Sequence, residues 1–183
     1  MAGILKVDKY QDFNGNDIMT SDGSGNLTLN NAAMKNTPAF FAYRTSDQSI
    51  STQTWTKAQI DNEEFDTDGA YDSSTNYRFT VPSGKAGKYQ FVAGMSARST
   101  NNDVYVAIIA LYKNGSAFNG NRLNSNSTSN AQFRGVGLTV DAILDLSVGD
   151  YIEVFGNIYG TSPIISAEGQ KEVYFGGYRI IGA

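Results

Sequence analysis

The stretch FTVPSGKAGKYQF, residues 79–91, carries apolar side chains at alternate positions on both sides of a turn sequence. Phe79 and Val81 precede the turn, and Tyr89 and Phe91 follow it. A period of two is typical of a half-buried β-strand. The stretch therefore predicts a hairpin of two strands whose aromatic side chains share one face.

The next segment, VYVAIIALY at residues 104–112, contains no charged residue and is apolar on both of its faces. A short apolar run of this kind is also compatible with a buried helix. Its β-branched residues and the Asn114-Gly115 turn that follows favour a strand. An antiparallel strand with one face in water should alternate with polar residues. We therefore expect the opposite sheet of a sandwich to cover one face and another copy of the chain to cover the other.

Short strand-like segments separated by turn residues fill the rest of the chain. GLTVDAILDLSVGDYIEV, residues 137–154, predicts two strands around a Val-Gly-Asp turn, and residues 171–182 predict the last long strand. The polar run at residues 46–77, in which Trp55 is one of the recurring apolar residues, predicts short strands and loops that lie over the body. The Asn- and Ser-rich residues 116–135 predict a surface loop.

The chain has no segment with a helical period and helix caps. Many short strands at close spacing are typical of sandwiches and jelly rolls. The expected fold class is therefore all-β, an antiparallel β-sandwich (jelly roll).

Residues 1–37 predict an extended N-terminal arm of short strands, ahead of a jelly-roll head domain at residues 38–183. Strand-like pieces at Ile4–Val7, Asp17–Met19 and Leu27–Leu29 are separated by Asn-Gly, Asp-Gly and Ser-Gly pairs. These pieces have too few apolar residues to close a core, and isolated strand pairs are marginally stable in water. We expect the arm to become ordered by docking on its copies or on a separate protein; a frayed terminus is the alternative.

Composition limits the chemistry available to the chain. Of its 183 residues, 40% are apolar and 17% are charged, and the formal net charge is -4. The absence of Cys and His excludes disulfides, a Ser-His-Asp triad and the usual zinc ligand sets. The sequence shows no basic stripe for nucleic acid, no apolar stretch that would insert in a membrane and no signal peptide, so we expect synthesis in a cytoplasm. We expect no enzymatic activity, no catalytic residue, no cofactor and no metal site.

Two other groups of residues have alternative interpretations. The carboxylates at residues 61–68 suggest a calcium site, but their spacing does not match a helix-loop-helix calcium loop, and a solvated acidic loop is favoured. Tyr89 and Phe91 resemble a sugar-stacking pair, but aromatic residues of the core are favoured. The Asn-rich loop is the place to look for ligand contact, because function tends to lie on loops held by a rigid body, but an ordinary disordered loop tip is favoured. The candidate ligand residues are Asn119, Arg122, Asn124 and Asn126.

Four segments resemble, in order, the globular head of complement subunit q and the related tumour-necrosis-factor-like jelly rolls. They are FTVP and GKYQF within residues 79–91, LYKNG at 111–115, LDLSVGDYIEV at 144–154 and YFGGYRI at 174–180. The resemblance implies a jelly roll that forms a tight homotrimer and carries binding rather than catalysis. The residues then expected in the trimer interface or the core are Tyr89, Phe91, Tyr105, Val106, Ile108, Ile109, Leu111, Phe175 and Tyr178.

The segment TSDGSGNLTLNN at residues 20–31 resembles the short-strand, glycine-turn stretches ahead of trimeric heads in bacteriophage fibre and appendage proteins. This resemblance implies a homotrimeric structural protein of the virion, in which residues 1–37 bind other virion proteins. The outward head would bind a glycan or protein of the host surface. A capsid-decoration trimer and a bacterial carbohydrate-binding module are the alternatives, and the absence of His weighs against a glycan-cleaving enzyme.

Overall fold

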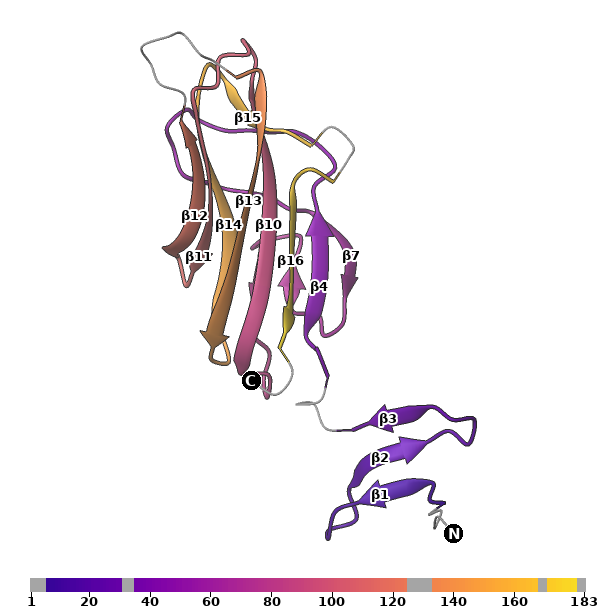
Figure 1. Ribbon diagram of the computed structural model, residues 1–183. Coiled ribbons are helices and arrows are strands. Elements are labelled where there is room, and N and C mark those ends of the chain that lie inside the picture. The colour runs from indigo at the N-terminus through magenta and orange to yellow at the C-terminus, as the bar shows by residue number, and fades with distance from the viewer. Residues whose placement is uncertain (1–5, 31–34, 125–132, 168–170, 181–183) are drawn as a thin grey trace.

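A computed structural model describes residues 6–30, 35–124, 133–167 and 171–180, and these residues form β-strands and connecting turns (Figure 1). Two antiparallel sheets pack face to face, and a third, small sheet precedes them. The predicted all-β, antiparallel sandwich is therefore confirmed. None of the described residues belongs to a helix that is long and apolar enough to span a membrane.

The larger sheet has seven strands and is centred on β10. Over almost its whole length β10 pairs with β13, and its other edge pairs with β16 and β15. From β16 the sheet continues to β4 and β7. Its strands are β4 (Ala39–Tyr43), β5 (Gln48–Ser49), β7 (Asn62–Asp66), β10 (Gly87–Ser99), β13 (Gly135–Leu146), β15 (Pro163–Ile165) and β16 (Tyr174–Arg179).

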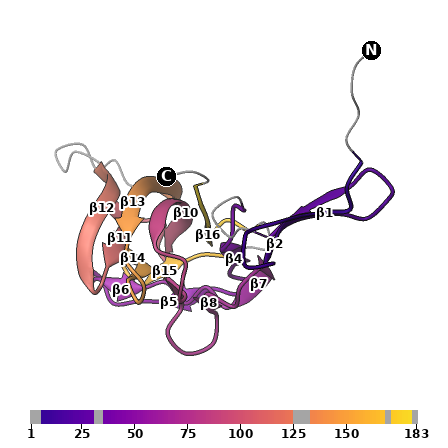
Figure 2. The same ribbon diagram turned by 90° about the horizontal axis from the view of Figure 1, so that it is seen from below.

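The other sheet has six strands, in the order β12-β11-β14-β9-β8, and β6 also pairs with β14. In both views of the chain β12, β11 and β14 lie next to one another (Figures 1 and 2). The Asn114-Gly115 turn joins β11 to β12, and both of its residues have positive φ, as the hairpin signal predicts. The strands are β6 (Thr56–Lys57), β8 (Tyr71–Asp72), β9 (Arg78–Thr80), β11 (Val106–Lys113), β12 (Ser116–Asn124) and β14 (Tyr151–Tyr159).

The prediction of a hairpin at residues 79–91 is wrong, because the two strands lie in opposite sheets. β9 pairs with β14 and β8, whereas β10 pairs only with strands of the larger sheet. Residues 81–86 cross between the sheets, and Val81 exchanges backbone hydrogen bonds with Gly149 and Asp150 of a second crossing. A period of two reports which side chains are buried, and it does not identify the partner strand.

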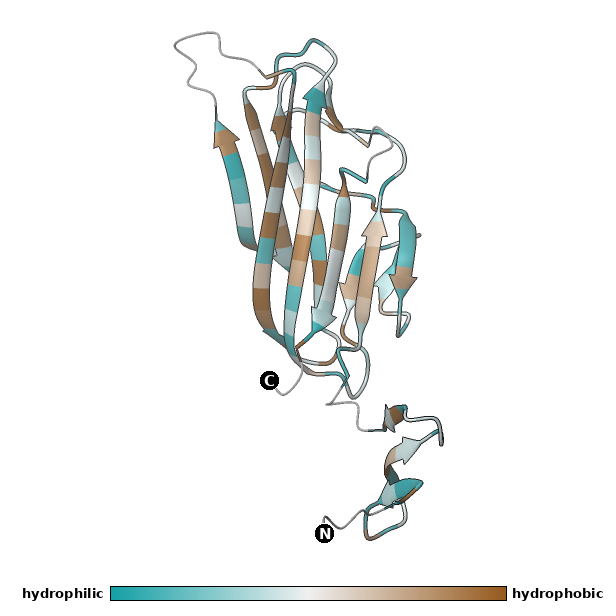
Figure 3. Cartoon of the chain, turned by 45° about the vertical axis from the view of Figure 1, so that its right-hand side comes forward, coloured by the Kyte–Doolittle hydropathy of each residue, from teal (hydrophilic) through white to brown (hydrophobic). Residues whose placement is uncertain are grey.

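An aromatic cluster fills the space between the two sheets. The Phe40 ring of the larger sheet stacks on Tyr71 and Phe79 of the smaller sheet, with centroids 5.1 Å apart in each pair. Phe91 approaches its neighbouring strand closely, since a Cβ atom on Gly177 would lie 2.5 Å from the Phe91 ring. Hydrophobic and polar bands alternate along the long strands, as expected when one side of each faces this core (Figure 3).

The predicted arm contains a three-stranded antiparallel sheet of β1 (Lys9–Gln11), β2 (Asp17–Ser21) and β3 (Leu27–Leu29). The prediction of a strand at residues 4–7 is wrong for residues 6 and 7, which the structure describes, because the pairing with β2 begins at Lys9. Within the described residues, no hydrogen-bonded ladder joins this sheet to the sandwich. The boundary between arm and head at residue 37 stays a prediction.

Candidate functional site

β11 is buried on its inner side and largely covered on its outer side within a single chain, where Ile108 and Tyr112 are half-buried. On its outer side Val106 is 7% exposed and Ala110 is 4% exposed. The Tyr112 ring, on the same side, stacks on Phe155 at 4.1 Å, and Trp55 contacts Tyr112 at 5.9 Å. The expectation that only another copy of the chain can cover this strand is therefore wrong, because aromatic side chains of the same chain pack over it.

Most of the residues predicted for the trimer interface or the core lie between the two sheets. Tyr89 is an example, and its hydroxyl donates a hydrogen bond to the carbonyl oxygen of Lys85 at 2.5 Å. Burial raises the pKa of Tyr89 to about 12, so the hydroxyl stays protonated at neutral pH. The role of these residues in a trimer interface stays a prediction. Tyr89, Phe91, Ile109, Leu111 and Phe175 lie in the core, Val106 is buried on the outer side of β11, Tyr105 and Ile108 are half-buried, and Tyr178 is exposed.

The predicted ligand loop is largely a strand. Asn119, Arg122 and Asn124 belong to β12, which pairs with β11, and Asn126 lies outside the described residues. The Asn119 amide donates a hydrogen bond to the carbonyl oxygen of Asp141 on β13 at 2.7 Å, so it links the edges of the two sheets. The loop prediction is wrong for residues 116–124, because a tight turn returns the chain along the free edge of β11.

The outer side of the seven-stranded sheet carries apolar side chains in register. One row runs from Phe65 on β7 through Phe41 on β4 and Gly176 on β16 to Val92 on β10. The Phe41 ring lies across Gly176, where a Cβ atom would come within 2.9 Å of that ring. This row is therefore a flat apolar strip on the surface of the sandwich.

The neighbouring row places Gln90 between Tyr178 and Ile143. Ile143 is 61% exposed, and Tyr178 is 43% exposed. A groove of about 240 Å³ with an almost wholly apolar lining lies along the two rows. Of the residues on this surface, the sequence pointed only to Tyr178. The period of two in β13 could also have indicated Ile143, because it places Ile143 on the opposite side of the strand from its buried neighbours. We call the surface formed by Phe41, Phe65, Val92, Ile143 and Tyr178 the apolar face.

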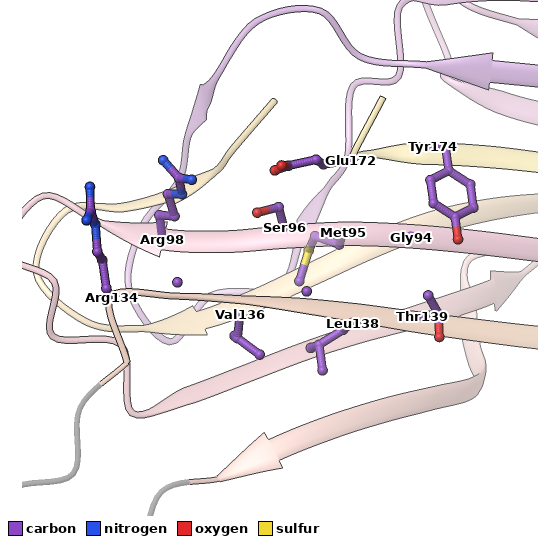
Figure 4. Close-up of a pocket in the computed structure, with 12 residues that line it drawn as sticks. Gly94, Met95, Ser96, Arg98, Arg134, Val136, Leu138, Thr139, Glu172 and Tyr174 are labelled. Carbon is purple, nitrogen blue, oxygen red and sulfur yellow. The ribbon is translucent and has the colours of Figure 1, made fainter. Parts of the chain in front are cut away.

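A second groove, of about 740 Å³, lies over the paired strands β10 and β13 on the same side of the sheet (Figure 4). We call it the polar groove after the charged side chains of Arg98, Arg134 and Glu172 in its lining. Arg98 and Arg134 lie at one end of it and Tyr174 lies at the other (Figure 4). The Tyr174 ring lies across Gly94, where a Cβ atom would come within 2.2 Å of the ring, and it also stacks on Phe41 at 5.8 Å. The polar groove and the apolar face therefore form one continuous surface.

The acids at residues 61–68 do not gather into one site. Asp68 forms an ion pair with Lys85 at 2.9 Å, and Glu64 forms one with Lys171 at 2.5 Å. In the part of the chain that the structure describes, no group of three or more acidic side chains is placed to hold a metal ion. These carboxylates are engaged by separate partners along β7 and the turn after it.

Comparison with known proteins identifies the fold alone. The chain matches no protein-family profile and no curated protein. It is similar to the solved globular domain of zebrafish complement 1qA protein, with a TM-score of 0.55 and 15% identity, covering 78% of this chain and 97% of that one. It is also similar to Eiger TNF from S. frugiperda, with a TM-score of 0.56 and 12% identity, covering 79% of this chain and 92% of that one.

These likenesses confirm the jelly roll that the four segments of sequence predict. The resemblance of residues 20–31 to bacteriophage fibre proteins stays a prediction. The site that the structure offers is thus a surface of the sheet, in the place of the loop that the sequence suggested.

The position of Asn119 predicts a structural role. Asn119→Ala removes the bond between β12 and β13 and should lower the free energy of unfolding by about 1 kcal/mol. Asn101→Ala is the matched control, since Asn101 is an exposed turn residue, and it should change stability by less than about 0.5 kcal/mol. Urea unfolding followed by fluorescence measures both, and equal stabilities of the two variants would contradict the assignment.

Proposed function

We propose that the chain is a non-enzymatic structural protein of a bacteriophage virion, a homotrimeric tail-fibre or appendage component with an outward jelly-roll head. The observation that carries the proposal is the apolar face. Large apolar side chains that lie together on the surface of a soluble protein mark interaction sites. The occupant that we propose is a second and a third copy of the chain.

Several properties of the apolar face favour copies of the same chain. It is flat, because the glycine at position 176 lets the Phe41 ring lie down on the sheet. It crosses the sheet from β7 to β13, so a closed ring of identical subunits can bury the same surface in every copy. The resemblance to complement subunit q heads and tumour-necrosis-factor-like jelly rolls implies the same stoichiometry.

The arm supports attachment to a larger particle. Its sheet exposes apolar side chains, among them Tyr10, Ile18 and Leu27, each more than 40% exposed. A sheet this small gains little from its own packing, so a partner that covers these side chains would stabilise it. In the proposed particle, virion proteins bind residues 1–37, and the three heads bind a host surface through many weak contacts that add by effective concentration.

The trimer is tested by placing a charge on the apolar face. Ile143→Asp should raise the dissociation constant of the trimer about 100-fold, since a buried, unpaired charge costs about 3 kcal/mol. Val148→Asp is the matched control, because Val148 is 53% exposed in the turn after β13, away from the apolar face. Light scattering should give about three chains of 19.8 kDa for the wild type and the control, and one chain for Ile143→Asp at low concentration.

A single-chain mass for the wild type at every concentration would contradict the proposed trimer. A trimer that Ile143→Asp leaves intact would show that a different surface forms it.

The virion location is tested by immunogold electron microscopy. An antibody raised against the full chain should label purified phage particles on the tail or its appendages. Label over the capsid shell would instead support a decoration trimer, and particles without label would reject the virion role.

A further inference from the structure

The outer side of the six-stranded sheet carries a group of packed aromatic rings. Tyr112 and Phe155 face outward there, because their neighbours Leu111 and Val154 face the core. Their rings stack at 4.1 Å, and Trp55 meets Tyr112 edge-on at 5.9 Å. Trp55 is the one tryptophan of the sequence and is 42% exposed. A large apolar ring is therefore presented to solvent beside two others.

A second aromatic pair lies on the same side of the sheet, four residues further along β14. Tyr105 and Tyr159 meet edge-on at 5.7 Å, and the Gln53 amide donates a hydrogen bond to the Tyr105 hydroxyl at 3.3 Å. Phe155 and Tyr159 lie about 13 Å apart along β14, since a strand rises about 3.3 Å per residue. This spacing is longer than one sugar ring and suits a chain of several. We call the surface formed by Trp55, Tyr105, Tyr112, Phe155 and Tyr159 the aromatic face.

Between the two groups lies a polar atom that lacks a partner. Asn157 is on the same outward side of β14, midway between Phe155 and Tyr159, and is 4% exposed. Its Oδ1 atom has no hydrogen-bond partner among the described residues. A buried acceptor without a donor costs free energy, which a water molecule bridging beneath the rings would recover.

Charged and amide groups flank the rings. Glu153 is buried on the same side of β14 and forms an ion pair with Lys57 at 2.5 Å, which holds the ammonium group 6.0 Å from the Phe155 ring centroid. Arg122 and Asn124 lie at the other margin on β12, where Arg122 donates a hydrogen bond to the Asn124 amide oxygen at 3.1 Å. The aromatic face thus combines flat apolar rings with donors and acceptors on both sides.

We propose that the aromatic face binds a linear polysaccharide. A pyranose ring has an apolar face of C–H bonds that packs on an aromatic ring, while its hydroxyl groups need hydrogen-bond partners at the rim. Trp55 and the Tyr112–Phe155 stack bind one sugar, and the Tyr105–Tyr159 pair binds another along the same chain. The exposed side chains of Arg122 and Asn124 at the rim form hydrogen bonds with the hydroxyl groups of the bound chain.

This inference names a ligand class for the display function proposed above, and its residues differ from those of the apolar face. The two surfaces lie on opposite outer sides of the sandwich, one on each sheet. A monomeric Ile143→Asp variant should therefore keep the affinity of a single site for an oligosaccharide. A result that rejects the trimer would therefore leave the proposed glycan site untouched, and a result that rejects the glycan site would leave the trimer untouched.

The test is a polysaccharide array, with neutral and acidic polysaccharides of bacterial envelopes and plant cell walls, probed with the full chain. A hexasaccharide of any polysaccharide that binds is then titrated into the protein while tryptophan fluorescence is followed. The fluorescence reports directly on the site, because Trp55 is the one tryptophan of the sequence. Trp55→Ala should weaken binding about tenfold or more, measured by calorimetry, and Trp55→Tyr should restore most of it.

Phe13→Ala is the matched control, since Phe13 is a fully exposed aromatic residue in an arm turn. It should leave hexasaccharide affinity unchanged. Circular dichroism verifies that each variant is folded. Absence of binding to every polysaccharide on the array would overturn the proposal, as would equal affinities of the wild type and Trp55→Ala.

Discussion

The aromatic cluster between the two sheets is the packing on which the rest of the structure depends. Phe40 stacks on Tyr71 and Phe79 and meets Phe175 edge-on at 4.9 Å, so one ring joins strands of both sheets. Aromatic side chains bury large apolar areas, and this cluster fixes the sheets face to face. Because the inward side chains complete a core within one chain, the outward side chains of both sheets are available for other roles.

The two outward surfaces have different chemistry. The apolar face of the larger sheet is built of side chains such as Ile143 and Val92, which lie on long, regularly paired strands. The aromatic face of the smaller sheet combines rings such as Trp55 with polar neighbours such as Asn157. Mainly apolar surfaces with few polar side chains, such as Gln90 here, favour close protein contact, whereas rings beside hydrogen-bonding groups favour polar ligands. Assembly and ligand binding therefore need not compete for one surface.

The sequence predicted burial better than it predicted pairing. The period of two correctly marked Tyr89 and Phe91 as buried, and the apolar run in β11 correctly indicated a strand whose outer side is also largely covered. The cover itself was missed, because Trp55 reaches Tyr112 through a contact between segments far apart in the chain. The ligand loop was misplaced for a related reason. An Asn-rich segment looks like a loop until a partner strand is known, and only the fold shows that Asn119 bonds to β13.

Whether the two outer faces serve different partners can be tested by hydroxyl-radical footprinting with mass spectrometry. Raising the protein concentration from monomer to trimer should protect Ile143 and Phe65 from oxidation and leave Trp55 reactive. Adding a bound polysaccharide should then protect Trp55 without further change at Ile143. Reactivity of Ile143 that is independent of concentration, or protection of Trp55 and Ile143 by the same partner, would show that the two faces do not have separate roles.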